Sequence, residues 1–344
     1  MSAEVIVVGG GVIGLTTAVV LAERGERVRV WARDPAAECT SAVAGGLCWP
    51  YRIEPQKLVE EWSLRSLDVY VPLAAEPSTT GVRMVAGTMA DTRPAELGRW
   101  AEAVPGLRAA SPDELPGGWA QGLRATVPLI DMPRHLAYLT ERLAAAGGRV
   151  ERREVSDLRE ATAEAAVVVN CSGLGARSLT GDPSVGPVRG QLVVVENPGV
   201  EEWFVATGGG GSASVSASTA SASASASASA SASASASASA ETTYLLPQPY
   251  GLVLGGTAQE GDWSREPDPG TAAAIVARCA RVRPEVAEAR VLAHRVGLRP
   301  ARPAVRLERE VAGGGGVLVH NYGHGGAGVT VAWGCAEVAA GLVG

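Results

Sequence analysis

Three glycines near the start of the chain have the spacing of a site for nucleotide phosphates. Gly9, Gly11 and Gly14 fill the pattern G-x-G-x-x-G directly after an apolar run at 5–8. The first glycine of this pattern permits a sharp turn, the second lets a pyrophosphate approach the backbone, and the third lets helix and strand pack closely. Asp34 follows Gly14 at about the 20-residue offset expected of an acid that binds a ribose. The alternative is a glycine-rich turn without a ligand. Since the pattern stands between a strand and a helix, we predict a dinucleotide site.

The elements that position this site alternate between strand and helix. Residues 5–8 and 27–31 have the pattern of buried strands, and residues 15–24 between them have helical spacing that ends at Gly25. Further along, residues 131–146 have the pattern of a helix, with Asp131 near its cap and a proline in its first turn. These elements predict the first unit of a nucleotide-binding fold.

Two later segments repeat the order of apolar strand followed by glycine. One is at 167–173, and the other, at 317–328, leads into a helical stretch at 329–342. Carboxyl ends of parallel strands meet at one edge of a sheet, which is where such folds bind their ligands. We therefore expect these two segments and the first glycine motif to lie side by side.

We predict an α/β protein with two domains. A Rossmann-like nucleotide-binding domain is discontinuous, over 1–52, 131–190 and 291–344, and a β-rich substrate domain of antiparallel sheet and helices is inserted twice, at 53–130 and 191–290. Three segments have the pattern of strands in that antiparallel sheet, namely 191–196, 243–246 and 252–254.

The segment 208–240 has a composition unlike the rest of the chain. It begins with consecutive glycines and ends in an unbroken Ser-Ala alternation from Ser221 to Ala240, without a charged or aromatic side chain. Such a segment buries too little surface to offset its ordering entropy, so we predict a flexible loop, with a silk-like ribbon as the alternative. Because long loops add little closure entropy, we expect the strands that flank it still to pair.

Composition excludes several classes of function. A net charge of −6 argues against nucleic acid or an anionic membrane as a partner. The five cysteines are scattered without a C-x-x-C pair, and the histidines lack the spacing of metal ligands. We therefore predict reduced thiols, a cytoplasmic location and no metal site. The apolar run at 5–22 contains the glycine turn and follows Glu4, so we reject a membrane helix there.

Several motifs together give a resemblance to a known family. The most specific is HNYGHGGAGVT at 320–330, followed by WGCA at 333–336. The supporting motifs are SAVAGGL at 41–47, RGQ at 189–191, YLLP at 244–247, GDW at 261–263 and GLRPARP at 297–303. With the first glycine motif, they resemble the D-amino acid oxidase family of flavoenzymes, which includes D-aspartate oxidase. The resemblance covers nearly the whole chain outside 208–240.

This resemblance implies that the dinucleotide is FAD and that the partners are a small-molecule D-amino acid and dioxygen. It implies hydride transfer from the substrate Cα to flavin N5, without an acid–base side chain. The imino acid then hydrolyses to a 2-oxo acid and ammonia, and dioxygen reoxidises the flavin to give hydrogen peroxide. Since no second cation is assigned to a substrate side chain, we expect neutral or apolar D-amino acids to be preferred. The protein is expected to be a monomer or homodimer.

By the same resemblance, the FAD contacts fall in separate segments of the chain. The implied residues are Gly9, Gly11, Val12, Ile13, Gly14, Arg33, Asp34, Thr40, Ala44, Gly45, Gly46, Leu47, Gly173, Gly325, Gly326, Gly328, Val329 and Thr330. The order of Arg33 and Asp34 is inverted relative to many members of the family, which leaves their individual roles open. A helix that starts at Thr330 would direct its positive end at the flavin and stabilise negative charge on the reduced ring.

Three residues are implied to hold the substrate. Arg299 matches the family's carboxylate-binding position, Tyr244 adds a hydroxyl donor, and the backbone carbonyl of Gly326 accepts from the amine. The alternative for Arg299, as for Arg302 and Arg306, is a salt-bridged strand. The alternative for Tyr244 is a packed aromatic residue.

His324 also lies in the most specific motif. An imidazole there has two interpretations, a catalytic base or a structural residue that hydrogen-bonds near the flavin. We favour the structural role.

Other functions stay open from the sequence. Within the family the alternative is a D-aspartate oxidase, and a related one is an amine oxidase of the glycine or sarcosine type. From a different class, the chain is alternatively an FAD-binding scaffold without turnover, whose active-site lid, placed by the resemblance between Phe204 and Tyr244, has degenerated. An NAD(P) dehydrogenase is a further alternative for the glycine motif.

Overall fold

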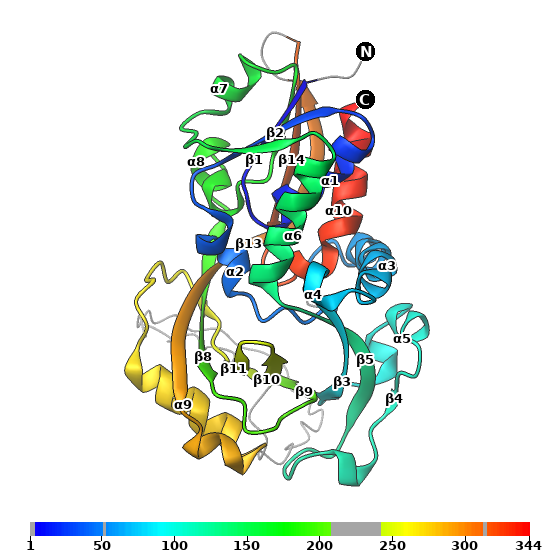
Figure 1. Ribbon diagram of the computed structural model, residues 1–344, viewed down its shortest axis with the longest axis vertical. Coiled ribbons are helices and arrows are strands. Elements are labelled where there is room, and N and C mark those ends of the chain that lie inside the picture. The colour runs from blue at the N-terminus through cyan, green and yellow to red at the C-terminus, as the bar shows by residue number, and fades with distance from the viewer. Residues whose placement is uncertain (1–3, 51–52, 208–241, 312–314) are drawn as a thin grey trace, which may run out of the picture.

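The structure is a computed structural model that describes residues 4–50, 53–207, 242–311 and 315–344. Fourteen strands of these residues form one sheet, in the order β4-β5-β3-β9-β10-β11-β8-β13-β14-β7-β1-β2-β6, with β12 beside β8. Figure 1 shows that the two halves of this sheet lie toward opposite ends of the molecule, with the start of β1 and the end of α10 at the end that holds β2.

One half of the sheet is parallel. Its strands are β14 (Val317–His324), β7 (Val167–Asn170), β1 (Glu4–Val8), β2 (Arg27–Ala32) and β6 (Arg149–Arg152). The central strands are runs of valine and isoleucine because both of their faces are covered, and residues 5–7 are fully buried. Since β1, β7 and β14 are neighbours, the glycine turns that follow them meet at one edge. The expected convergence of these segments is confirmed.

Long helices cover one face of the parallel half. They are α1 (Val12–Glu23), α6 (Met132–Ala145), α10 (Gly328–Val343) and α3 (Gln56–Leu73). α1 packs against both α6 and α10, and α10 packs against α3 (Figure 1). The predicted helix boundaries are confirmed at two points. Gly25 follows α1 with a φ of 94°, and the Asp131 carboxylate caps α6 by accepting from the Arg134 N–H at 3.3 Å.

The other half of the sheet is mixed and mostly antiparallel. Its strands are β13 (Val291–Val311), β8 (Gly186–Val195), β11 (Gly251–Gly255), β10 (Thr242–Gln248), β9 (Trp203–Thr207), β3 (Val82–Ala90), β5 (Gly122–Ile130), β4 (Arg108–Ala109) and β12 (Gln259–Glu260). The three predicted antiparallel strands correspond to β8, β10 and β11. Helix α9 (Pro269–Ala280) packs against these same strands.

The strands that flank the low-complexity segment pair with each other. Thr207 at the end of β9 lies opposite Thr242 at the start of β10. This pairing confirms the expectation that a long insertion leaves its flanking strands intact. The predicted flexible loop at 208–240 itself lies outside the described residues.

Strand β13 joins the two halves. Its residues 291–301 pair with β8, and its residues 301–311 pair with β14. The hydrogen-bonded sheet therefore continues from one half to the other. The two-domain boundaries given above stay a prediction.

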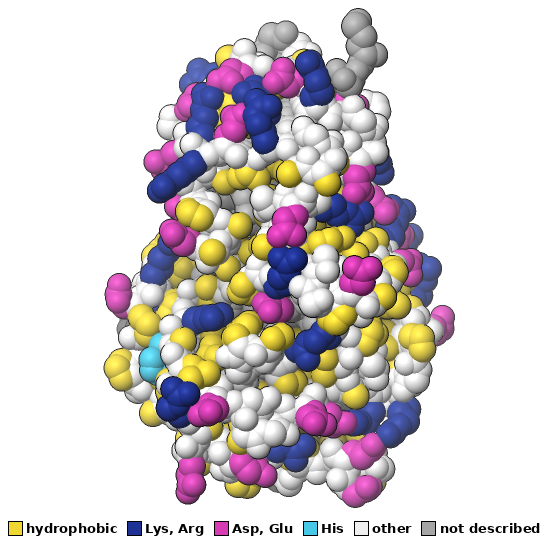
Figure 2. Space-filling view, in the orientation of Figure 1, with side chains coloured by type: hydrophobic (Ala, Val, Ile, Leu, Met, Phe, Trp, Pro, Cys, Tyr) yellow, Lys and Arg dark blue, Asp and Glu magenta, His cyan; other side chains and the backbone are white. Residues whose placement is uncertain are grey.

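Short elements complete the fold. They are α2 (Thr40–Val43), α4 (Pro77–Thr80), α5 (Trp100–Ala103), α7 (Leu158–Thr162), α8 (Ala176–Leu179) and the 3-10 turns η1 (Ala36–Glu38), η2 (Pro94–Glu96), η3 (Pro112–Glu114), η4 (Gly173–Gly175) and η5 (Pro284–Glu288). Within the described ranges, every helix is too short or too polar to cross a lipid bilayer. Acidic and basic side chains are interspersed over the face shown in Figure 2.

The close packing of α1 against β1 depends on Gly14. A Cβ at this position would overlap the carbonyl oxygen of Gly9 and lie 3.3 Å from the Cys171 Cβ. We therefore expect Gly14→Ala to lower the free energy of unfolding by about 1–3 kcal/mol, measured by urea denaturation.

Gly341→Ala is the matched control for this substitution. Gly341 is also a helix glycine, but a Cβ there meets nothing within 4 Å. This change is expected to raise stability by about 0.5–1 kcal/mol. Equal effects of the two substitutions would contradict the packing role of Gly14.

Candidate active site

The carboxyl edge of the parallel half opens into a cavity of about 2380 Å³ that extends under the mixed half of the sheet. It contains every residue of the predicted FAD and substrate sites except Gly14, which is packed beneath it. The predicted residues in its wall are Gly9, Gly11, Val12, Ile13, Arg33, Asp34, Thr40, Ala44, Gly45, Gly46, Leu47, Gly173, Tyr244, Arg299, Gly325, Gly326, Gly328, Val329 and Thr330. Segments far apart in the chain thus meet around one space.

The turn after β1 forms the first wall. Gly9 has a φ of 120°, and a Cβ there would overlap the carbonyl group of Cys171 at the end of β7. α1 then begins at Val12 with no acidic residue in its first turn, so the positive end of its dipole faces the cavity uncompensated. Ser41, which sequence reasoning missed, accepts from the Val12 N–H at 3.0 Å. This wall is suited to a diphosphate.

The acid that follows β2 is held by its neighbour. Arg33 donates from Nε and Nη2 to Asp34 Oδ2 at 3.0 and 2.8 Å. The hydrogen bond from Arg33 lowers the pKa of Asp34, which keeps this carboxylate ionised and able to accept from a ribose hydroxyl. At the same end, the Arg153 guanidinium lies 3.7 Å from the centre of the Trp31 ring. Both residues line the cavity, and no motif indicated Arg153.

The segment at 44–47 lies against the edge of the mixed half. Gly46 has a φ of 82°, and a Cβ there would overlap the carbonyl oxygen of Ile130. Gln248 donates from Nε2 to the carbonyl oxygen of Gly45 at 2.9 Å, and Leu47 forms a single bridge with Leu129. These contacts fix the backbone of the segment where it borders the cavity.

The start of α10 forms the opposite wall. This helix begins at Gly328, slightly before the predicted start at Thr330, and it too has no acidic residue in its first turn. Thr330 donates from Oγ1 to the carbonyl oxygen of Trp49 at 3.0 Å, and Tyr70 donates to that of Val329 at 3.0 Å. The positive end of this helix therefore faces the cavity from a fixed position.

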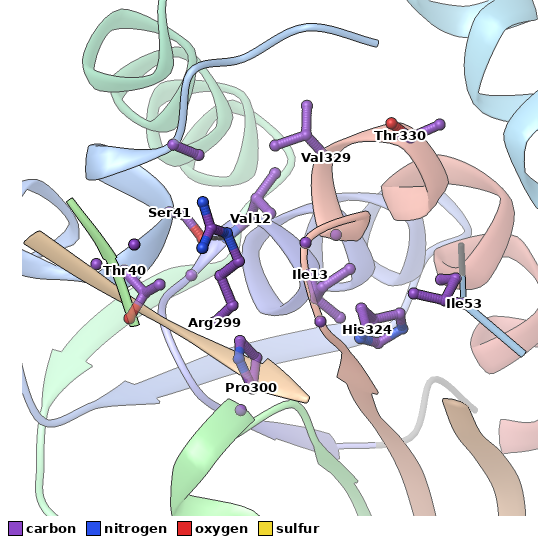
Figure 3. A pocket seen from close by; sticks show the side chains of 18 of the residues that line it. Val12, Ile13, Thr40, Ser41, Ile53, Arg299, Pro300, His324, Val329 and Thr330 are labelled. Atoms are coloured by element: carbon purple, nitrogen blue, oxygen red, sulfur yellow. Dashed lines mark hydrogen bonds between the residues drawn. The ribbon is translucent and has the colours of Figure 1, made fainter. Parts of the chain in front are cut away.

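Arg299 differs from Arg302 and Arg306 on the same strand. Its guanidinium projects from β13 into the cavity (Figure 3), and Nη1 donates to the carbonyl oxygen of Thr257 at 3.0 Å. Arg302 pairs with Asp182 at 2.9 Å, and Arg306 pairs with Glu308 at 2.6 Å. Arg299 has no acidic partner among the described residues. The salt-bridge alternative therefore holds for Arg302 and Arg306, while Arg299 keeps a positive charge that an anion can use.

Tyr244 and Gly326 border the same cavity. Tyr244 lies on β10, where Val205 is its partner on β9 and Gly255 its partner on β11. In the register of the sheet, Met89 lies beyond Val205 and Leu192 beyond Gly255. Residues directly opposite one another on neighbouring strands have their side chains on the same face of the sheet. Met89, Val205 and Leu192 therefore form an apolar row across the sheet on the face of the tyrosine ring.

His324 lies in the wall but is buried. Its side chain projects toward the cavity (Figure 3), and its Nε2 has no hydrogen-bond partner among the described residues. Burial lowers the pKa of His324 to about 3. A neutral imidazole with this pKa is a poor base near neutral pH, which agrees with the structural role.

Two buried residues of β8, Arg189 and Gln191, hold the loop at 261–268, which borders the cavity near Arg299. Arg189 donates to the carbonyl oxygens of Ser264 and Glu266 at 3.1 and 2.6 Å. Gln191 donates from Nε2 to the carbonyl oxygen of Asp268 at 2.7 Å. The RGQ motif thus has a structural function, which the sequence did not reveal because these partners lie about 70 residues away.

The donors around the cavity fit a flavin dinucleotide. Two helix N-termini without an acidic residue in their first turn, those of α1 and α10, face one continuous space from different sides. At Gly9 and Gly46 a Cβ would collide with the backbone of Cys171 and Ile130, so glycine lets these turns pack closely against neighbouring segments at the border of the cavity. Among the described residues, no cluster of histidine, cysteine or acidic side chains could hold a metal ion.

Comparisons with known proteins agree on one family. A family model described as FAD dependent oxidoreductase matches residues 4–342. The D-amino-acid oxidase of Streptomyces coelicolor is 61% identical, over 98% of this chain and 96% of that protein. That of Rubrobacter xylanophilus is 47% identical, over 99% and 96%, and the human D-aspartate oxidase is 34% identical, over 99% and 95%. The structure of a glycine oxidase from Bacillus cereus shares the fold, with a TM-score of 0.75 at 19% identity over 99% and 95% of the two chains.

The buried His324 makes stability depend on pH. Its folded pKa of about 3 lies below the ordinary value of about 6.5, so the unfolded chain binds more protons between these values. Stability contributed by the neutral imidazole is therefore lost as pH falls below about 6.5, and at pH 5 the loss is about 2 kcal/mol. We expect His324→Gln to reduce the difference in the free energy of unfolding between pH 7.5 and pH 5 by this amount, measured with urea.

His294→Gln is the control, since it removes an exposed imidazole. An unchanged pH dependence in His324→Gln would contradict the assignment of this loss to His324.

Proposed function

The chain belongs to the FAD-dependent oxidoreductase family, and from this premise we propose that it catalyses the oxidative deamination of D-amino acids with neutral or apolar side chains. The products are a 2-oxo acid, ammonia and hydrogen peroxide. The observation that carries the proposal is Arg299, an arginine in the wall of the cavity whose charge no described acidic side chain neutralises.

Both ends of the cofactor have candidate contacts in the cavity wall. The turn at 9–13 and the end of α1 would hold the diphosphate, and Asp34 would accept from the ribose. The segments at 44–47 and 325–330 would hold the flavin ring, with the positive end of α10 directed at it. Bound FAD supplies a two-electron acceptor that dioxygen can reoxidise.

The substrate is bound through its carboxylate and its amine. Arg299 pairs with the carboxylate, Tyr244 donates a hydroxyl hydrogen bond to it, and the carbonyl of Gly326 accepts from the amine. When the carboxylate and the amine are both held, one orientation is left for the Cα–H bond of the substrate. This orientation is the basis of selection for the D-enantiomer. Because His324 is a poor base, we assign it no role in deprotonating the substrate amine.

The preference for neutral or apolar side chains rests on the row of Met89, Val205, Tyr244 and Leu192 across the sheet. These side chains line the cavity without adding a charge. A substrate carboxylate placed against them would be desolvated without a partner, at a cost of several kcal/mol. D-Aspartate is therefore expected to be a poor substrate.

We also propose a cytoplasmic location and a monomer or homodimer. All five cysteines are free thiols, as expected in a reducing compartment. Absence of nucleic acid as a partner is supported by the net charge of −6.

The function is tested by purifying the protein and recording its visible spectrum and its substrates. We expect flavin absorption, and peroxide production with D-alanine that is absent with L-alanine and weak with D-aspartate. A colourless protein that stays colourless in added FAD would reject the assignment. A yellow protein that produces no peroxide with any D-amino acid would support the scaffold without turnover.

Substitutions at the two substrate contacts are expected to differ in size. Arg299→Leu leaves a bound carboxylate unpaired and should cost about 3–5 kcal/mol in kcat/KM for D-alanine. Tyr244→Phe removes one hydroxyl and should cost about 1–2 kcal/mol. Both are measured by steady-state oxygen consumption.

The matched control is Arg302→Leu, on the same strand but ion-paired with Asp182. It is expected to lower stability and to leave KM close to that of the unmodified protein. Equal losses in Arg299→Leu and Arg302→Leu would show that the carboxylate contact is misassigned.

A further inference from the structure

Two side chains of the proposed substrate site lie across glycines of neighbouring strands. A Cβ added at Gly255 on β11 would overlap the ring of Tyr244, which stands opposite it on β10. A Cβ added at Gly190 on β8 would lie within 2.6 Å of Arg299 Cζ. In each case the three nearest atoms all belong to that one side chain. Both side chains therefore lie flat over the backbone of an adjacent strand.

The order of the strands makes these side chains converge. β10, β11, β8 and β13 are consecutive in the sheet, so Tyr244 and Arg299 come from the outer two and lie over the inner two. They approach the same short segment. The Arg299 Nη1 donates to the carbonyl oxygen of Thr257 at 3.0 Å, and a Cβ at Gly256 would lie 2.6 Å from the Tyr244 hydroxyl.

Neither Gly190 nor Gly255 is required by its own backbone. Their φ angles lie outside the range that L-residues avoid, in contrast to the φ of 137° at Gly251. Alanine is thus compatible with the main chain at both positions. The obstacle to a side chain there is the arginine or the tyrosine, which would have to lift away from the sheet.

We propose that Gly190 and Gly255 are positioning residues that set the separation between Arg299 and Tyr244, and hence the fit of the substrate carboxylate between them. This inference rests on the proposed function, because it takes these two side chains to be the carboxylate contacts. It assigns a role to the central residue of the RGQ motif. Arg189 and Gln191 hold the adjacent loop from the other face of β8, and Gly190 leaves room for Arg299 on the cavity face.

The test measures carboxylate binding without turnover. Propionate keeps the carboxylate and methyl group of alanine but lacks the amine, and its Kd is obtained from the change in flavin absorption of the holoenzyme. Gly190→Ala is expected to raise this Kd by about tenfold or more, because the guanidinium must move. The affinity for FAD is expected to stay unchanged, since the atoms nearest to a Cβ at Gly190 all belong to Arg299 and none to a proposed FAD contact.

Gly186→Ala is the matched control. Gly186 lies on the same strand, outside the cavity wall, and a Cβ there meets nothing within 4 Å. Its Kd for propionate is expected to equal that of the unmodified protein. Equal Kd values for Gly190→Ala and Gly186→Ala would overturn the proposal.

A second measurement separates steric positioning from general weakening of β8. Any loss of Tm caused by Gly190→Ala is expected to be small, because only the end of the Arg299 side chain must move, and to disappear in an Arg299→Ala background. Gly255→Ala is expected to show the same dependence on a Tyr244→Ala background. A loss of Tm that persists in both backgrounds would overturn the proposal even if the Kd changes.

Failure of the proposed function would give a different result. An unmodified holoenzyme that binds no propionate at all would refute the carboxylate site itself. Unmodified protein that binds propionate, together with an unaffected Gly190→Ala variant, would refute only the positioning role.

Discussion

The hydrogen-bonded ladder along β13 is the constraint on which the site depends. This strand pairs with β8 over its first half and with β14 over its second, so it fixes the mixed half of the sheet against the parallel half. Arg299 lies close to the point where the partner changes. The strand that joins the two halves of the sheet therefore also places the Arg299 guanidinium in the cavity, between the proposed FAD contacts and the apolar row. A shift of one residue would direct Arg299 to the opposite face.

Charge is distributed so that the cavity keeps a few uncompensated positive groups. Arg302 and Arg306 on β13 are paired with Asp182 and Glu308, and Asp34 is paired with Arg33. Besides Lys57, Arg33, Arg153, Arg177 and Arg265, which also line the cavity, the positive groups that face it are the Arg299 guanidinium and the positive ends of α1 and α10. These groups are complementary to a carboxylate, a diphosphate and a reduced flavin respectively. Because the helix ends and the guanidinium are fixed before any ligand arrives, they need little reorganisation.

The site also tolerates a long insertion beside it. The segment at 208–240 separates β9 from β10, yet the two strands pair up to Thr207 and Thr242. Tyr244 is only two residues beyond this pair, and its position comes from the register with Val205 and Gly255. The entropic cost of closing a loop grows only slowly with its length. The hydrogen bonds between β9 and β10 do not depend on that length, so the register of these two strands is kept.

The sequence by itself determined the nucleotide half of this protein. The glycine spacing, the apolar strands and the caps at Gly25 and Asp131 are local signals, since each acts through a backbone conformation or a neighbour within a few residues. They predicted the strands β1, β2, β7 and β14, the helices α1, α6 and α10 and the edge at which these strands end, but neither β6 nor α3. The motif resemblance supplied the family and the predicted FAD and substrate contacts. All of these contacts line the cavity except Gly14.

Only the tertiary structure decided that Arg299, and not Arg302 or Arg306 on the same strand, keeps its charge for a ligand. It also decided the contacts of Ser41, Arg153 and Arg189, and it showed that Gly190 and Gly255 lie beneath Arg299 and Tyr244. The physical reason is that these properties depend on partners far away in the chain. Ion pairing, burial and close approach are set by the register between strands, which no local pattern of residue types specifies.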